Sequence, residues 1–111
     1  MPASITDRTR RMIAEVVNKI VAEYAPDKII LFGSYAHGHP DKDSDIDLLI
    51  VKDTDMRPID RWTHLKRLLR DRESTVSVSP MVYTPREIED RLAGGDFFLK
   101  DAVEKGVVLY G

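Results

Sequence analysis

The stretch that most constrains this chain is residues 28–51, where two apolar runs flank a polar loop. The runs, residues 29–32 and 46–51, are rich in Ile, Leu and Val, which is the composition of strands in a buried sheet. Asp45 and Asp47 lie at the start of the second run. Because burying an unpaired charge is costly, these carboxylates need a compensating partner, and a bound cation is a common one.

The length and composition fit one globular domain. The chain has 111 residues, of which 42% are hydrophobic and 32% are charged, so we expect residues 1–111 to form a single domain with its own core. The formal net charge of -2 gives no overall field to attract nucleic acid. The chain has no cysteine, so disulfides and thiolate metal sites are excluded. No apolar stretch is long enough for a membrane span, so we expect a cytoplasmic protein without membrane contact.

Hydrophobic periodicity and turn residues divide the chain into helices and strands. The predicted helices span residues 6–25, 58–72, 84–93 and 96–105, and the predicted strands span residues 28–32, 45–51, 75–83 and 107–110. Thr84 and Glu87 form a capping box at the start of the third helix, with Pro85 at its first position. Pro80 cannot donate a ladder hydrogen bond, so we place the third strand at a sheet edge or an irregularity.

The second helix carries an apolar stripe and a basic face. The stripe consists of Ile59, Trp62, Leu65, Leu68 and Leu69. Its spacing predicts packing in the core, and we interpret Trp62 as a core residue rather than a stacking platform for a base. The basic residues are Arg61, Lys66, Arg67, Arg70 and Arg72. We expect a solvated face from them, with contact to a triphosphate, RNA or an acidic partner as the alternative.

The spacing of Asp45 and Asp47 places their side chains on one face of a strand, with Cα atoms about 6.5 Å apart. Two converging carboxylates can hold divalent cations, and magnesium prefers such oxygen ligands while leaving positions for water or phosphate. The alternative is a strand end that emerges into solvent with ordinary surface aspartates. These two residues alone favour neither interpretation.

Gly33 and Ser34 end the first strand, and ten residues separate them from Asp45. A strand that stops at Gly-Ser can present backbone N–H groups and a hydroxyl to a phosphate, although the pair is often only a turn. A loop of this length can bring both strand ends to one cleft. The combination of Gly-Ser and Asp-x-Asp therefore favours a site that holds a metal ion and a triphosphate.

The two motifs, residues 32–38 (Phe-Gly-Ser-Tyr-Ala-His-Gly) and residues 43–48 (Asp-Ser-Asp-Ile-Asp-Leu), resemble the signature of the DNA-polymerase-beta-like nucleotidyltransferase superfamily. The short chain is similar to its minimal nucleotidyltransferases, the MNT family. The resemblance implies an α+β fold with a small mixed sheet and helices packed on it. It also implies magnesium-dependent transfer of a nucleoside monophosphate from a triphosphate, with AMP from ATP as the expected case, to a hydroxyl of a protein or small molecule. The implied partner is a HEPN-domain protein, for which such chains act as antitoxins.

Carried over by position, the resemblance assigns a role to each motif residue. Gly33 and Ser34 would grip the triphosphate, and Ser44 would assist by hydrogen bonding. Asp45 and Asp47 would be the catalytic residues and metal ligands, holding two magnesium ions during turnover.

The chain departs from the superfamily pattern at two positions. The third carboxylate is expected on the strand at residues 75–83, where the corresponding position is Ser79 and no Asp or Glu occurs. A serine is a poor metal ligand and cannot act as a general base at neutral pH, so nucleotide binding is a firmer prediction than turnover. Water, the acceptor or another residue such as Asp53 could take the missing role. Tyr35 stands where many relatives carry Arg.

Three functions are therefore compatible with the chain. The first is a nucleotidyltransferase. The second is a weakly catalytic or non-catalytic nucleotide-binding module that blocks a partner by contact, and the third is a nucleotide sensor. Templated synthesis of nucleic acid is not expected, because 111 residues leave no room for domains that hold primer and template. The sequence is also compatible with a homo-oligomer.

Overall fold

The computed structural model describes residues 6–41, 44–70 and 77–111. Its elements are α1 (Asp7–Tyr24), β1 (Lys28–Phe32), α2 (Ser34–His37), β2 (Ile46–Val51), α3 (Pro58–Arg70), β3 (Val78–Tyr83), α4 (Pro85–Ala93), α5 (Phe97–Lys105) and β4 (Val107–Tyr110). The predicted α+β class is confirmed. No helix in these ranges is long and apolar enough to cross a membrane.

The four strands form one mixed sheet in the order β3-β2-β1-β4. β1 pairs antiparallel with both β2 and β4, and β2 pairs parallel with β3. β3 is therefore an edge strand, as Pro80 predicted. The carbonyls of Ser77 and Tyr83 accept hydrogen bonds from residues of β2 and its continuation. Because backbone groups alternate in direction along a strand, Pro80 faces the open edge, and its missing N–H removes no bond to β2.

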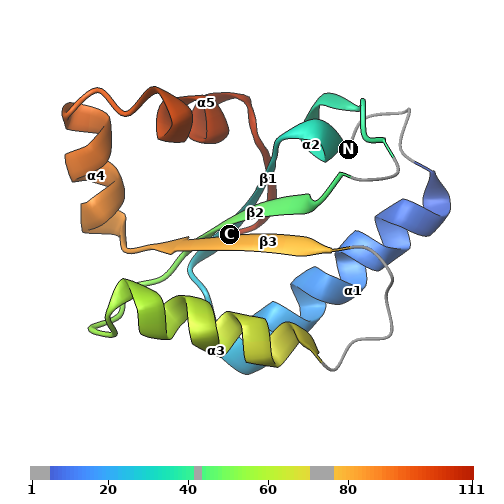
Figure 1. Ribbon diagram of the computed structural model, residues 1–111, viewed down its shortest axis with the longest axis horizontal. Helices are drawn as coiled ribbons and strands as arrows, with labels where there is room; N and C mark the ends of the chain where they lie inside the picture. The colour runs from blue at the N-terminus through green and yellow to red at the C-terminus, as the bar shows by residue number, and fades with distance from the viewer. Residues whose placement is uncertain (1–5, 42–43, 71–76) are drawn as a thin grey trace.

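The two faces of the sheet are covered by different helices (Figure 1). α1 and α3 pack on one face, where the core contains Ile20, Leu48 and Leu65. α4 and α5 lie on the other face, over a smaller cluster that includes Phe32 and Leu49. Since side chains alternate along β2, Asp47 points to the α4–α5 face together with Leu49.

Side-chain caps begin α1 and α4, and the predicted capping box of α4 is confirmed. The Thr6 hydroxyl accepts a hydrogen bond from the Thr9 N–H at the start of α1. Thr84 and Glu87 form the reciprocal capping box of α4. The predicted end of the second helix at residue 72 and the predicted start of the third strand at residue 75 lie outside the described residues.

The predicted orientation of α3 is wrong in part. Ile59 is 59% exposed and Trp62 is 48% exposed, whereas Arg61, expected on a solvated face, is only 5% exposed. Arg61, Leu65 and Leu69 form the buried stripe of the helix instead. A guanidinium can be buried here because its charge has partners on other segments of the chain.

The partners of Arg61 tie α3 to α4. Its Nη1 lies 2.6 Å from Glu87 Oε1, and its Nε donates to the Met56 carbonyl over 2.7 Å. The same Glu87 oxygen accepts the Thr84 N–H over 2.8 Å. Burial alone would raise the pKa of the Glu87 carboxyl, but the hydrogen bonds from Thr84 and Arg61 outweigh it and lower that pKa. The capping carboxylate thus also neutralises the buried arginine.

We predict that Glu87→Gln lowers the free energy of unfolding by about 1–2 kcal/mol at neutral pH, because it leaves the buried Arg61 without its counter-charge. Because the folded state lowers the pKa of Glu87, its contribution is present above the ordinary carboxyl pKa and is lost as the pH falls through the folded value. Urea unfolding from neutral to acid pH should therefore show the difference shrinking in acid.

The matched control is Asp101→Asn, which removes the charge from the exposed pair between Asp101 and Lys105. That change should cost less than about 0.5 kcal/mol. Equal stability of wild type and Glu87→Gln at neutral pH, or a difference that grows in acid, would contradict the prediction.

Candidate active site

The register between β1 and β2 places the two predicted motifs in contact. Phe32, the last residue of β1, pairs with Asp47 on β2. The chain then leaves β1 through Gly33, which has a φ of +73°. A Cβ atom at Gly33 would lie 2.3 Å from Asp47 Oδ2, so only glycine fits here. The backbone of the Gly-Ser motif therefore passes directly against the Asp47 carboxylate.

The short helix α2 follows from this turn. The Gly33 carbonyl accepts the N–H groups of Ala36 and His37, and the helix ends at Gly38, whose φ is +77°. Ser34 is the first residue of α2 and is half-buried. The helix thus begins at the Gly33–Asp47 contact, where the motif predicts the phosphate.

Tyr35, which stands where relatives carry Arg, is only 7% exposed. Its side chain belongs to the core cluster under α1 and α3. Burial raises the pKa of its phenol, and the nearby carboxylates of Asp41 and Asp45 raise it further. This position of α2 therefore supplies packing rather than a cation.

The two aspartates lie at the end of β2, with one shift from the prediction. β2 begins at Ile46, so Asp45 belongs to the preceding loop and is exposed, whereas Asp47 is half-buried in the strand. Burial raises the pKa of the Asp47 carboxyl, and the charge of Asp45 raises it further. A divalent cation bound between the two carboxylates would stabilise the charged form of Asp47.

Ser79 stands where the superfamily resemblance leads us to expect a third carboxylate. It pairs in register with Asp47 across the parallel strands β2 and β3, which is the position expected from the superfamily pattern. Within residues 6–41, 44–70 and 77–111, no group of three or more His, Cys, Asp or Glu residues could hold a metal. The described donor set fits a magnesium ion that takes its remaining ligands from water and phosphate.

Asp53 cannot replace the missing carboxylate. Its N–H donates to Asp27 Oδ2 beyond the other end of β2. Asp53 lies six positions after Asp47 along extended chain, and this spacing corresponds to a distance of about 20 Å. The suggestion that Asp53 could act in the site is therefore wrong.

The predicted nucleotide contact of Ser44 stays a prediction. Its hydroxyl accepts the Asp41 N–H over 2.9 Å and donates to Asp41 Oδ1 over 3.2 Å. These bonds close the loop that leads into Asp45. Ser44 therefore shapes the approach to the aspartates from within the loop.

One residue beside the site was not identified from the sequence. The ring of Phe98 on α5 packs edge-on against Phe32, with centroids 5.6 Å apart, and remains 58% exposed. Phe32 is the residue paired with Asp47, so Phe98 offers an aromatic surface next to the carboxylate. The sequence does carry a signal for it, because α5 buries Leu99 and Ala102 and that helical phase leaves Phe98 outside.

We predict that Gly33→Ala destabilises the fold by about 3 kcal/mol or more, since it combines backbone strain at positive φ with the overlap on Asp47. Chemical denaturation would measure the loss. Gly95→Ala is the matched control, because Gly95 has a φ of +85° and a Cβ atom there would meet no other atom within 4 Å. That variant should lose only about 1 kcal/mol.

The double variant Gly33→Ala/Asp47→Ala separates strain from overlap. Truncating Asp47 removes the Oδ2 and Cγ atoms that the new methyl group meets at 2.3 and 3.2 Å. Relative to Asp47→Ala alone, the added Gly33→Ala change should then cost no more than Gly95→Ala. A loss that persists in full would show that the contact with Asp47 is not the cause.

Two curated proteins are similar to parts of this chain in sequence. A candidate protein adenylyltransferase from Methanocaldococcus jannaschii is 51% identical over 47 residues, covering 40% of this chain and 47% of that protein. A second one from the same organism is 33% identical over 82 residues, covering 69% and 56%. The chain spans about half the length of these curated relatives.

A solved structure matches most of the fold. The crystal structure of a candidate nucleotidyltransferase from Sulfolobus solfataricus superposes with a TM-score of 0.61 at 25% identity, covering 91% of this chain and 78% of that one. The family model described as nucleotidyltransferase domain matches residues 11–109, a span that contains Gly33, Ser34, Asp45 and Asp47. The chain therefore belongs to the nucleotidyltransferase domain family.

Proposed function

We propose that this protein is a magnesium-dependent adenylyltransferase that transfers AMP from ATP to a hydroxyl group of a protein. The observation that carries the proposal is the close approach of Gly33 to Asp47, which places the turn expected to bind phosphate against the carboxylate expected to bind metal. The names of the two archaeal relatives support a protein rather than a small molecule as the acceptor. The family resemblance points to a HEPN-domain protein as that acceptor.

In the proposed reaction, the acceptor oxygen attacks the α-phosphorus of ATP. A bond forms between that oxygen and phosphorus, and the bond from the α-phosphorus to the oxygen bridging the β-phosphate breaks. Pyrophosphate leaves with the electron pair, and the hydroxyl proton passes to water. The product is an AMP ester on the acceptor.

Each residue of the site has a part in this scheme. The backbone at Gly33 and the Ser34 hydroxyl hold the triphosphate, and Asp45 and Asp47 would hold magnesium. Bound magnesium supplies positive charge that stabilises the charge developing on the phosphates. Phe98 offers its exposed ring face to the adenine.

We predict that the protein, incubated with magnesium and ATP labelled at the α-phosphate, transfers label to its acceptor protein and releases pyrophosphate. Asp47→Asn should lower transfer by about a hundredfold or more, since it removes the half-buried carboxylate proposed to bind the metal. The measurement is label on the acceptor after electrophoresis, with HEPN-domain partner protein as the first acceptor tested.

The control for Asp47→Asn is Asp53→Asn, which neutralises a carboxylate at the far end of β2 and should leave transfer unchanged. A partner that is inhibited equally by wild type and by Asp47→Asn, without label, would contradict the enzyme. That result would favour a nucleotide-binding module that acts by contact, a function that Ser79 in place of a carboxylate also supports.

We further predict that Ser79→Asp raises the transfer rate by about tenfold or more, because it places a carboxylate in register with Asp47 to bind metal and accept the proton. Single-turnover kinetics with labelled ATP would measure the rate. Val108→Asp, which introduces a carboxylate at an exposed position of β4 on the opposite edge of the sheet, is the control and should not raise it. An unchanged rate in Ser79→Asp would show that the missing carboxylate does not limit the reaction.

A further inference from the structure

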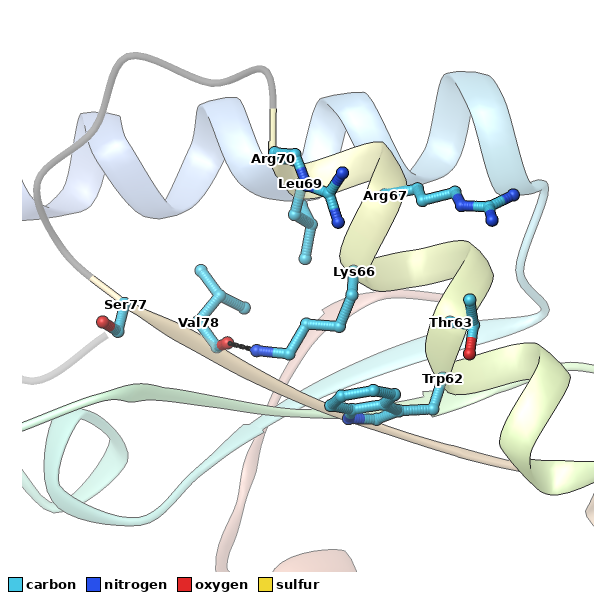
Figure 2. A pocket seen from close by; sticks show the side chains of 8 residues that line it. All are labelled: Trp62, Thr63, Lys66, Arg67, Leu69, Arg70, Ser77 and Val78. Carbon is cyan, nitrogen blue, oxygen red and sulfur yellow. Dashed lines mark hydrogen bonds between the residues drawn. The ribbon is translucent and has the colours of Figure 1, made fainter.

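A groove runs between α3 and the open edge of the sheet. Its larger part has a volume of about 580 Å³ and is lined by Trp62, Lys66, Arg67, Arg70, Ser77 and Val78, as Figure 2 shows. A smaller hollow of about 240 Å³ lies on the other side of Trp62, along residues 80–83 of β3. The two hollows share Trp62 and border β3 at Val78 and at residues 80–83, and we call them together the edge groove.

The larger part of the edge groove has an apolar floor and a cationic rim. Leu69 and Val78 are buried beneath it. Lys66, Arg67 and Arg70 are exposed, and none of them forms an ion pair with another described residue. These three cations form a local patch of positive charge on a chain whose formal net charge is -2. The rim therefore attracts anionic groups, whereas the floor accommodates apolar ones.

Trp62 has the surroundings of an interface residue. Half of its side chain is exposed, and exposed Ile59 lies one helical turn before it. The Lys66 ammonium lies 5.6 Å from the centre of the indole ring and donates to the Val78 carbonyl over 3.4 Å. Tryptophan beside cationic side chains and apolar area is the composition enriched in protein–protein interfaces.

One end of the edge groove lies next to the candidate active site. Val78 pairs in register with Ile46, the residue between Asp45 and Asp47. A polypeptide that occupies the groove and continues around β3 would thus bring its next residues to the face that carries Asp47. This geometry joins a binding surface to the point where the acceptor hydroxyl must arrive.

We propose that the edge groove binds an acidic polypeptide segment of the acceptor protein, an inference that rests on the proposed function. Carboxylates of the segment pair with Lys66 and Arg70, and an apolar side chain packs on Trp62. The apolar floor and the outward-facing backbone of β3 favour a polypeptide over a nucleic acid strand, because an extended peptide can bond to an open sheet edge and place apolar side chains on such a floor.

Trp62 is the only tryptophan of the chain, so its fluorescence reports directly on the edge groove. The probe is a random copolymer of glutamate and tyrosine, titrated into the full chain with magnesium and an unreactive ATP analogue. Glutamate homopolymer is titrated in parallel, because it has no phenol that would itself absorb the exciting light and emit. We expect a saturable change in Trp62 emission with both polymers.

Lys66→Glu/Arg70→Glu should weaken this binding by about tenfold or more, because attraction becomes repulsion at the rim. Lys100→Glu/Lys105→Glu reverses two exposed cations on α5, across the sheet, and should leave binding unchanged. Binding of the ATP analogue by each variant verifies that the active-site fold is retained. The milder variant Lys66→Gln/Arg70→Gln should also weaken binding of the polymers, but to a smaller extent.

Three outcomes would overturn the proposal. The first is equal binding of the polymers by wild type and by the Lys66/Arg70 variants, or no change in Trp62 emission. The second is tighter binding of an oligouridylate than of the polymers with the same dependence on Lys66 and Arg70, which would assign the groove to RNA. The third is a change in Trp62 emission with protein concentration alone, which would assign it to a second copy of the chain.

Failure of the proposed function would look different. If the chain binds the polymers through Lys66 and Arg70 but never transfers label from ATP, the result supports the edge groove as a binding site and contradicts the adenylyltransferase activity. If the chain transfers label equally well after the charges of Lys66 and Arg70 are reversed, the result supports the enzyme and contradicts the groove as its acceptor site.

Discussion

The contact of Gly33 with the Asp47 carboxylate depends on a single register, that of β1 against β2. Phe32 must pair with Asp47 for the turn at Gly33 to pass over that side chain. A shift of one residue would move Asp47 to the face covered by α1 and α3 and would bring an apolar residue to the site. The continuous apolar runs of both strands hold the register, because nearly every residue in them is buried. The core therefore determines where the chemistry can occur.

The division of the sheet into two unequal faces explains how a charged site coexists with this core. The α1–α3 face holds the larger cluster of fully buried aliphatic side chains, and Tyr35 of α2 joins it. The α4–α5 face holds a smaller cluster near the middle of the sheet, so the end that bears Asp47 is only half-covered. Burial raises the pKa of Asp47 without removing it from solvent. Such a carboxylate gains stability when a cation binds, and it remains accessible to one.

Local patterns predicted the local features of this fold, and partners distant in sequence account for the errors. The strands and the cap at Thr84 follow from hydrophobic alternation and turn residues, and the position of Ser79 follows from the superfamily resemblance. The burial of Arg61 could not be predicted from α3 alone, because its counter-charge comes from Glu87, 26 residues later. Once Arg61 turns inward, the helical phase turns Trp62 outward. The same long-range dependence places Phe98 beside Phe32.

Serine at position 79, where the superfamily resemblance leads us to expect a third carboxylate, bears on which hydroxyl the proposed reaction could use. With no carboxylate at that position to take the proton, the acceptor of the proposed reaction would lose it to water. A phenol, with a pKa of about 10, ionises far more readily than the aliphatic hydroxyl of serine or threonine. The proposed reaction would therefore favour a tyrosine acceptor. An acidic segment held in the edge groove would compensate further, since positioning the phenol against the bound triphosphate replaces a bimolecular encounter with an intramolecular step.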